Sequence, residues 1–91
     1  MATNITAIYV DATATITDYP TRIRGVSWFN VSGDEAEIVI RDSSAGGTII
    51  FKAGLPDNGN SDVYLTDIGI AARTKVHVSV PASVFGTVFI G

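Results

Sequence analysis

The chain has 91 residues, a net charge of −3, and a composition that is 46% hydrophobic but only 16% charged. Its length corresponds to one domain, 1–91, and no apolar run reaches the roughly 20 residues that a membrane-spanning helix needs. The six basic residues are scattered, so the sequence has no basic patch of the kind that binds nucleic acid. We therefore expect neither a nucleic acid nor a membrane as partner.

The apolar content is high for so small a protein. A domain of this size buries only a little over roughly 60% of the surface of its unfolded chain. Either the packing is unusually complete or part of the apolar surface contacts a partner, and we favour the partner. The chain has no cysteine and its first residues do not resemble a signal peptide, which indicates synthesis in a reducing cytoplasm.

Apolar and polar residues alternate along Ile8–Thr17, which predicts one long strand with a threonine-rich face toward solvent. A second strand is predicted over Arg22–Val31. It contains Gly25, and a glycine inside a strand often marks a bulge that changes which face the following residues occupy. Ile23, Phe29 and Val31 are expected on one face and Val26 and Trp28 on the other, so both faces of this strand are apolar.

The stretch Ala36–Ala53 predicts a hairpin around which the other strands pack. Its two runs, Glu37–Arg41 and Thr48–Lys52, are rich in β-branched residues and are joined by a Ser/Gly segment. The loop after it, Gly54–Asp62, is rich in Asp, Asn, Gly and Pro, which favour turns.

Further strands are predicted near the C-terminal end of the chain. Val63–Leu65 is a short strand, and Asp67–Ala72 is an edge turn or a brief helical turn with Gly69 at a special backbone angle. Arg73–Val80 places its valines on one face and His77 on the other, and Val84–Ile90 is apolar on both faces. Seven or eight short strands with regular turns predict an all-β fold, an antiparallel β-sandwich or jelly-roll-like barrel.

Strands with two apolar faces need a second covering surface, because one sandwich has one interior. A subunit interface would provide it, with Tyr9, Trp28, Phe85 and Phe89 as candidate anchors, since aromatic residues are enriched at interface cores. The alternative is a curled barrel that covers its own strands. The N-terminal strand, 1–20, is a candidate arm that contacts a neighbouring subunit.

The sequence predicts no catalytic, cofactor or metal site. His77 is the only histidine, and on a strand it is expected to be a surface residue. The loop residues Asn58, Asn60 and Asp62 alternate as calcium ligands do, but Val63 stands where an EF-type loop needs glycine. We interpret Asp57–Asp62 as a plain loop. Sugar binding through Trp28 or Tyr64 stays open as an alternative.

The sequence resembles small all-β virion proteins of tailed bacteriophages, which decorate capsids or form part of tails and fibres. The resemblance covers roughly Thr21–Gly91 and lies in packing and turn positions: Thr21–Val26 (TRIRGV), Ile40–Asp42 (IRD), Gly47–Phe51 (GTIIF), Ile68–Ile70 (IGI), Val76–Val78 (VHV) and Val88–Gly91 (VFIG).

The resemblance implies a non-enzymatic structural protein of the virion, made in the host cytoplasm. The most specific expectation is a capsid decoration (cement) protein that self-associates, with a trimer favoured, and that binds the major capsid protein or another virion protein. A tail or fibre component is one alternative. A carbohydrate-binding module is an alternative from another class.

Overall fold

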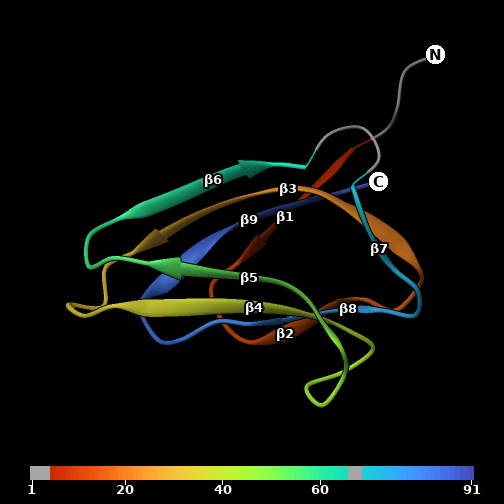
Figure 1. Cartoon of the computed structure of the whole chain (residues 1–91), viewed down its shortest axis with the longest axis horizontal. Coiled ribbons are helices and arrows are strands. Elements are labelled where there is room, and N and C mark those ends of the chain that lie inside the picture. Colours follow the sequence, from red (N-terminus) through yellow and green to blue (C-terminus); the bar gives the residue numbers. More distant parts are fainter. Residues whose placement is uncertain (1–4, 66–68) are drawn as a thin grey trace.

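The protein forms two antiparallel sheets packed face to face, as the sequence predicted. The computed structural model describes residues 5–65 and 69–91. These residues form nine strands, one or two more than expected, and the strands are β1 (Thr6–Val10), β2 (Ala14–Thr17), β3 (Thr21–Asn30), β4 (Ala36–Asp42), β5 (Ile49–Leu55), β6 (Asn60–Tyr64), β7 (Ile70–Ala72), β8 (Val76–Ser79) and β9 (Val84–Ile90) (Figure 1). None of the described residues belongs to a helix long and apolar enough to cross a membrane.

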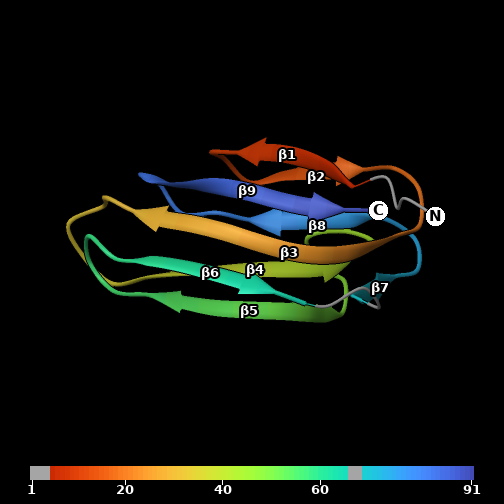
Figure 2. The same cartoon turned by 90° about the horizontal axis from the view of Figure 1, so that it is seen from above.

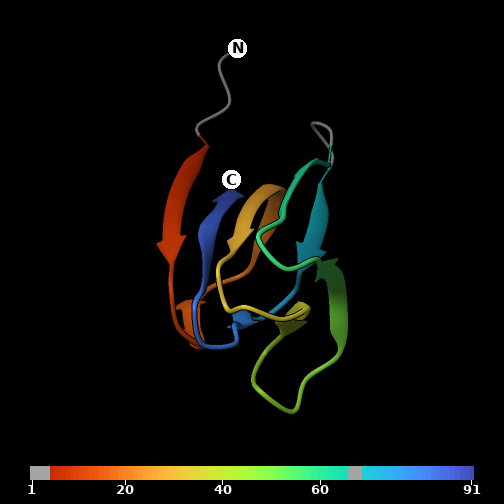
Figure 3. The same cartoon turned by 90° about the vertical axis from the view of Figure 1, so that its left-hand side faces the viewer.

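Strands that follow one another in sequence mostly lie in opposite sheets. The first sheet has the order β1-β9-β3-β6, and β7 pairs with the beginning of β3. The second sheet has the order β2-β8-β4-β5. Seen from above, β9 lies between β1 and β3 (Figure 2). Seen from one end, β1 and β2 lie on one side of the sandwich and β5 and β6 on the other (Figure 3).

The prediction of one long strand over Ile8–Thr17 is wrong, because this stretch forms two strands in different sheets. β1 pairs with β9, and β2 pairs with β8. Between them, residues 11–13 carry the chain from the first sheet to the second, so Ala12 is exposed and not inside. Both strands are integral edges of the sandwich, and Val10 belongs to the core. The strands of residues 6–17 therefore belong to the two sheets of the sandwich.

The predicted bulge in β3 is present and decides which side chains enter the core. The register of β3 against β9 shifts between Ile23 and Gly25. Because of this extra residue, Ile23 faces the same interior as Val26 and Trp28, and all three are buried. Phe29 points to the opposite, outer side.

The predicted hairpin is present but is not the centre of the fold. β4 and β5 pair from Ala36↔Leu55 to Arg41↔Ile49, and β5 is the outer strand of the second sheet. The strand with most partners is β3, which pairs with β6, β7 and β9. β3 therefore joins three other strands of the first sheet.

The loop between β5 and β6 is shorter than predicted. β5 continues through Leu55 and β6 begins at Asn60, so only residues 56–59 form the turn. Its backbone is closed by the N–H of Gly59, which donates to the carbonyl of Pro56 at 2.9 Å. Farther along, Gly69 has the predicted special backbone angle, with φ +65°, whereas Asp67 and Ile68 lie outside the described residues.

The core lies between the two sheets and consists of the side chains that point inward from every sheet strand. The valines of β8 and the alternate residues of β9 are buried there, as predicted; the largest buried apolar side chains are Trp28, Ile23, Ile38, Ile40, Leu55 and Ile90. A folded monomer of this mass exposes about 5,100 Å², and this chain exposes 5084 Å². The exposed area is thus ordinary for a chain of this mass. Several large apolar side chains lie on this surface: Ile5, Tyr9, Tyr19, Phe29, Val31, Ile49 and Tyr64.

Candidate functional site

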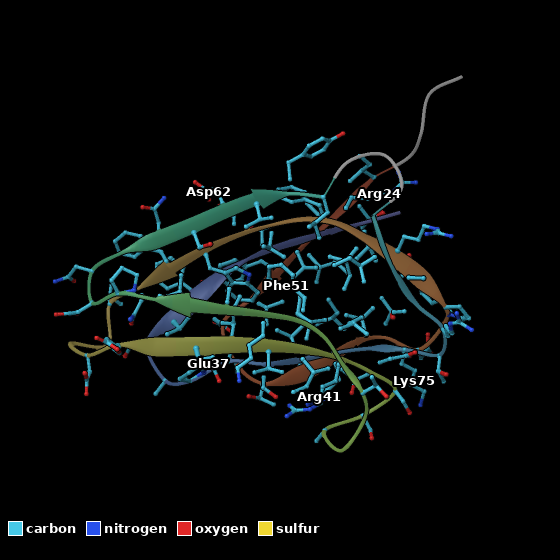
Figure 4. All side chains as sticks on the ribbon, viewed as in Figure 1. Arg24, Glu37, Arg41, Phe51, Asp62 and Lys75 are labelled. Atoms are coloured by element: carbon cyan, nitrogen blue, oxygen red, sulfur yellow. The ribbon has the colours of Figure 1, made fainter. Side chains whose placement is uncertain are left out.

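The outer faces of the two sheets differ in chemistry. The second sheet presents polar and charged side chains, including an ion pair in which Lys52 Nζ lies 3.5 Å from Glu37 Oε2. In Figure 4, Glu37 and Arg41 lie on the lower side of the molecule, along the second sheet. The first sheet presents aromatic side chains instead. Its outer face is therefore the candidate functional surface.

The strand register arranges that surface in three rows across the first sheet. In one row Gly25 lies between Phe89 of β9 and Tyr64 of β6. The middle row is polar and runs through Thr87, Ser27 and Asp62, with Tyr9 at its β1 end. In the third row Phe85 lies beside Phe29. Two apolar regions are thus separated by a polar row.

The first apolar region is an aromatic cluster formed by Tyr9, Phe29 and Phe85. The ring centroids of Tyr9 and Phe85 are 6.4 Å apart, and those of Phe29 and Phe85 are 5.9 Å apart. Tyr9 is 63% exposed and Phe29 is 37% exposed. Aromatic groups at these separations attract one another, so the cluster is held together while its outer surface remains in contact with water.

The second region is a hollow beside Gly25, which we call the Gly25 hollow. It has a volume of about 490 Å³ and is lined by Ile5, Arg24, Gly25, Val26, Ser27, Asp62, Val63, Tyr64 and Phe89. The ring of Phe89 leans over Gly25: its nearest atom would lie 3.7 Å from a Cβ added there. Tyr64 is 70% exposed and forms the opposite wall.

Of the four predicted anchors, three lie on this outer face. Tyr9, Phe85 and Phe89 are there, but Trp28 is only 1% exposed and belongs to the core. The bulge before it directs its side chain inward. Phe29, its neighbour in sequence, points outward instead. The bulge predicted at Gly25 was the signal in the sequence that indicates Phe29 and not Trp28 as the outward side chain.

His77 is buried, contrary to the expectation of a surface residue, and is 8% exposed. Its Nδ1 atom lies 3.0 Å from the hydroxyl of Thr15, and its Nε2 atom has no hydrogen-bond partner among the described residues. Arg41 is its register partner on the other side. In an enzyme, a nucleophile–histidine pair normally has a third group that orients the histidine. Here the residue paired with His77 on β4 is the cationic Arg41.

Within the residues that the structure describes, no three histidine or acidic side chains gather as a metal site. The predicted loop Asp57–Asp62 is divided between the turn and β6. Asp62 lies on β6, where its carboxylate accepts hydrogen bonds from Ser27 Oγ at 2.5 Å and from Asn60 Nδ2 at 3.2 Å. Its oxygens thus face the outer surface of the first sheet and not a calcium loop.

Comparisons with protein-family models, with curated proteins and with solved structures find no match to this chain.

Proposed function

We propose that this chain is a non-enzymatic structural protein that self-associates through the outer face of the first sheet. The observation that carries the proposal is the aromatic cluster of Tyr9, Phe29 and Phe85, exposed on one sheet while the other sheet carries charged groups. Aromatic residues are enriched in the cores of protein interfaces, and clustered apolar groups on a surface mark contact sites. A second copy of the chain is the proposed occupant.

The proposed setting is a phage virion, in which the protein is a capsid decoration protein that binds the major capsid protein. Its contribution would be mechanical, because apolar area buried across capsomer contacts stabilises the shell without chemistry. Support comes from the resemblance in the sequence and from a compact all-β fold without a catalytic arrangement around its single histidine. The trimer is the favoured oligomer for such a protein.

We further propose that the sandwich is a jelly roll. The strand orders β1-β9-β3-β6 and β2-β8-β4-β5 support this, since most successive strands lie in opposite four-stranded layers and β7 pairs with β3 outside this order. Jelly rolls are frequent in viral capsid proteins. The fold is thus compatible with the proposed setting.

Light scattering over a dilution series tests self-association. The double variant Tyr9→Ser/Phe29→Ser removes apolar surface from the aromatic cluster. The matched control, Tyr19→Ser/Ile49→Ser, removes two exposed apolar side chains elsewhere on the surface. We expect an oligomer, with a trimer favoured, for the wild type and the control, and a monomer for the cluster variant.

A wild-type monomer at high micromolar concentration would contradict self-association, as would a cluster variant that associates as well as the control. The setting in the virion is tested separately, by mass spectrometry of purified particles of the phage that encodes the chain. Absence of the protein from complete particles would overturn the virion proposal.

A further inference from the structure

We propose that the Gly25 hollow binds one pyranose ring of a neutral sugar. This site lies on the same face as the aromatic cluster but is separated from it by the polar row. None of the three residues of the cluster lines the hollow. The sugar site therefore uses other residues than the aromatic cluster, although both lie on the same face of the first sheet.

The hollow has the volume of a small-molecule site. Ligand pockets in proteins have volumes of about 300–1,000 Å³, and this hollow has about 490 Å³. It exists because Gly25 carries no side chain between its register partners Phe89 and Tyr64. Any larger residue at position 25 would project into this space, where a Cβ would already lie 2.9 Å from the carbonyl oxygen of Val63.

The apolar walls match one part of a sugar. A pyranose ring presents C–H groups on its faces, and these pack against aromatic rings. Phe89 is half-buried with its ring over Gly25, while Tyr64 is largely exposed at the opposite wall. Tyr64 combines an apolar ring with a polar tip, as is common where a ligand is partly apolar and partly solvated.

The polar groups match the other part, the hydroxyls at the edge of the ring. Asp62 lies toward one end of the hollow and Arg24 toward the other, both on the outer side of the first sheet (Figure 4). Asp62 accepts hydrogen bonds from Ser27 and Asn60, and each carboxylate oxygen can accept more than one. Arg24 donates through Nε to the carbonyl of Gly91 at 3.2 Å, and its guanidinium has further N–H groups.

The charges favour a neutral ligand. The lining contains one carboxylate and one guanidinium, so the hollow has no net charge. An isolated phosphate would face Asp62, and a simple cation would face Arg24. A neutral polyhydroxyl ligand can donate to the carboxylate and accept from the guanidinium at the same time, and hydrogen bonds to charged groups are stronger than neutral ones.

The test is an amide chemical-shift titration of the whole chain with the methyl glycosides of glucose, galactose, mannose and N-acetylglucosamine, one at a time. We expect at least one to give saturable shifts at Gly25, Ser27 and Tyr64, with a millimolar dissociation constant. Tyr64→Ala and Asp62→Asn should each weaken binding about tenfold or more. Tyr64→Phe, which keeps the ring, should bind more tightly than Tyr64→Ala.

The matched control is Tyr19→Ala, which removes an exposed tyrosine side chain outside both the hollow and the aromatic cluster and should leave the dissociation constant unchanged. The proposal is overturned if none of the glycosides gives saturable shifts up to its solubility limit. It is also overturned if binding survives in a folded Tyr64→Ala variant with wild-type affinity. The titration is repeated in the Tyr9→Ser/Phe29→Ser variant, in which self-association is removed. Sugar binding in this variant shows that the hollow binds the sugar without a second copy of the chain.

Discussion

The side chain of Asp42 holds the backbone of Thr74, because Asp42 Oδ1 accepts the N–H of Thr74 at 2.9 Å. The same carboxylate accepts the N–H groups of Arg73 at 3.0 Å and of Lys75 at 3.4 Å. Asp42 is the last residue of β4, and the three N–H groups belong to the turn before β8. One carboxylate therefore fixes the point where these two strands begin to pair, at Asp42↔Val76.

We predict that Asp42→Asn lowers the melting temperature at neutral pH. The N–H groups of Arg73 and then Thr74 are the main causes that lower the pKa of the Asp42 carboxyl below its ordinary value of 3.8. Because the folded-state pKa is lowered, the ionised carboxylate stabilises the fold above pH 3.8, and this contribution is lost as the pH falls through the lowered pKa. The difference between wild type and variant should therefore shrink in acid.

Thermal unfolding followed by circular dichroism from about pH 7 to about pH 2 measures this dependence. Asp57→Asn is the control, since Asp57 is an exposed residue of the β5–β6 turn. It should leave the melting temperature close to that of the wild type. An Asp42→Asn difference that is the same at every pH would show that the charge of the carboxylate has no role.

We predict that Asn30→Ala destabilises the domain by about 2 kcal/mol. Asn30 is fully buried. Its Nδ2 donates to the carbonyls of Asp34, Leu55 and Pro56 at 2.7, 3.3 and 3.2 Å, and its Oδ1 accepts the N–H of Ser32 at 2.9 Å. One amide thus joins the β3–β4 turn to the β5–β6 turn, and its removal leaves buried groups unsatisfied.

The expected loss corresponds to about 10 °C in melting temperature for a domain of this size, measured by calorimetry or urea unfolding. Asn60→Ala is the control, because the Asn60 side chain is exposed and bonds only to Asp62 in the described hydrogen bonds. Equal losses for the two variants would contradict the role given to Asn30.

We predict that Gly86→Ala unfolds or severely weakens the protein, whereas Gly54→Ala is tolerated. A Cβ at Gly86 would collide with the backbone carbonyl of Ser27 and with the backbone and ring of Trp28. A Cβ at Gly54 would meet nothing within 4 Å. Overpacking costs about 1–3 kcal/mol or more, whereas alanine for glycine at an unstrained position gains about 0.5 kcal/mol. Urea midpoints that do not differ between the two variants would refute this prediction.

We predict that Thr17→Val costs about 1–3 kcal/mol, although valine has nearly the shape of threonine. Thr17 is buried where the register of β2 against β8 shifts. Its hydroxyl accepts the N–H of Val76 at 3.0 Å and donates to the carbonyl of Tyr19 at 3.1 Å. Thr17→Ser keeps these bonds and should retain most of the stability. A Thr17→Ser loss as large as that of Thr17→Val would assign the effect to packing.

The sequence allowed prediction of elements whose signals are local. The alternating valines of β8, the two-faced pattern of β9 and the bulge at Gly25 follow from side-chain period and from glycine, which each act within a few residues. The hairpin of β4 and β5 was likewise predicted. Its edge position was not, because the order of strands in a sheet depends on contacts between distant segments.

Features that depend on contacts between distant segments of the chain could not be predicted. Alternation continues without a break from Ile8 to Thr17, and no proline or glycine marks the crossing at residues 11–13. The burial of His77 depends on Thr15 of β2, a strand that the sequence pattern assigned to a single long element. On the candidate site, the aromatic anchors were partly predicted, but the hollow requires three strands in register and no local pattern indicates it.

The position of β9 between β1 and β3 also constrains the order in which the domain can fold. Among the described strands, β1 pairs only with β9, and β9 supplies the core residues Val84, Val88 and Ile90. A nascent chain that ends before residue 84 would leave the edges of β1 and β3 unpaired, and unpaired edges are prone to aggregation. Completion of the first sheet must therefore wait until the ninth strand has left the ribosome.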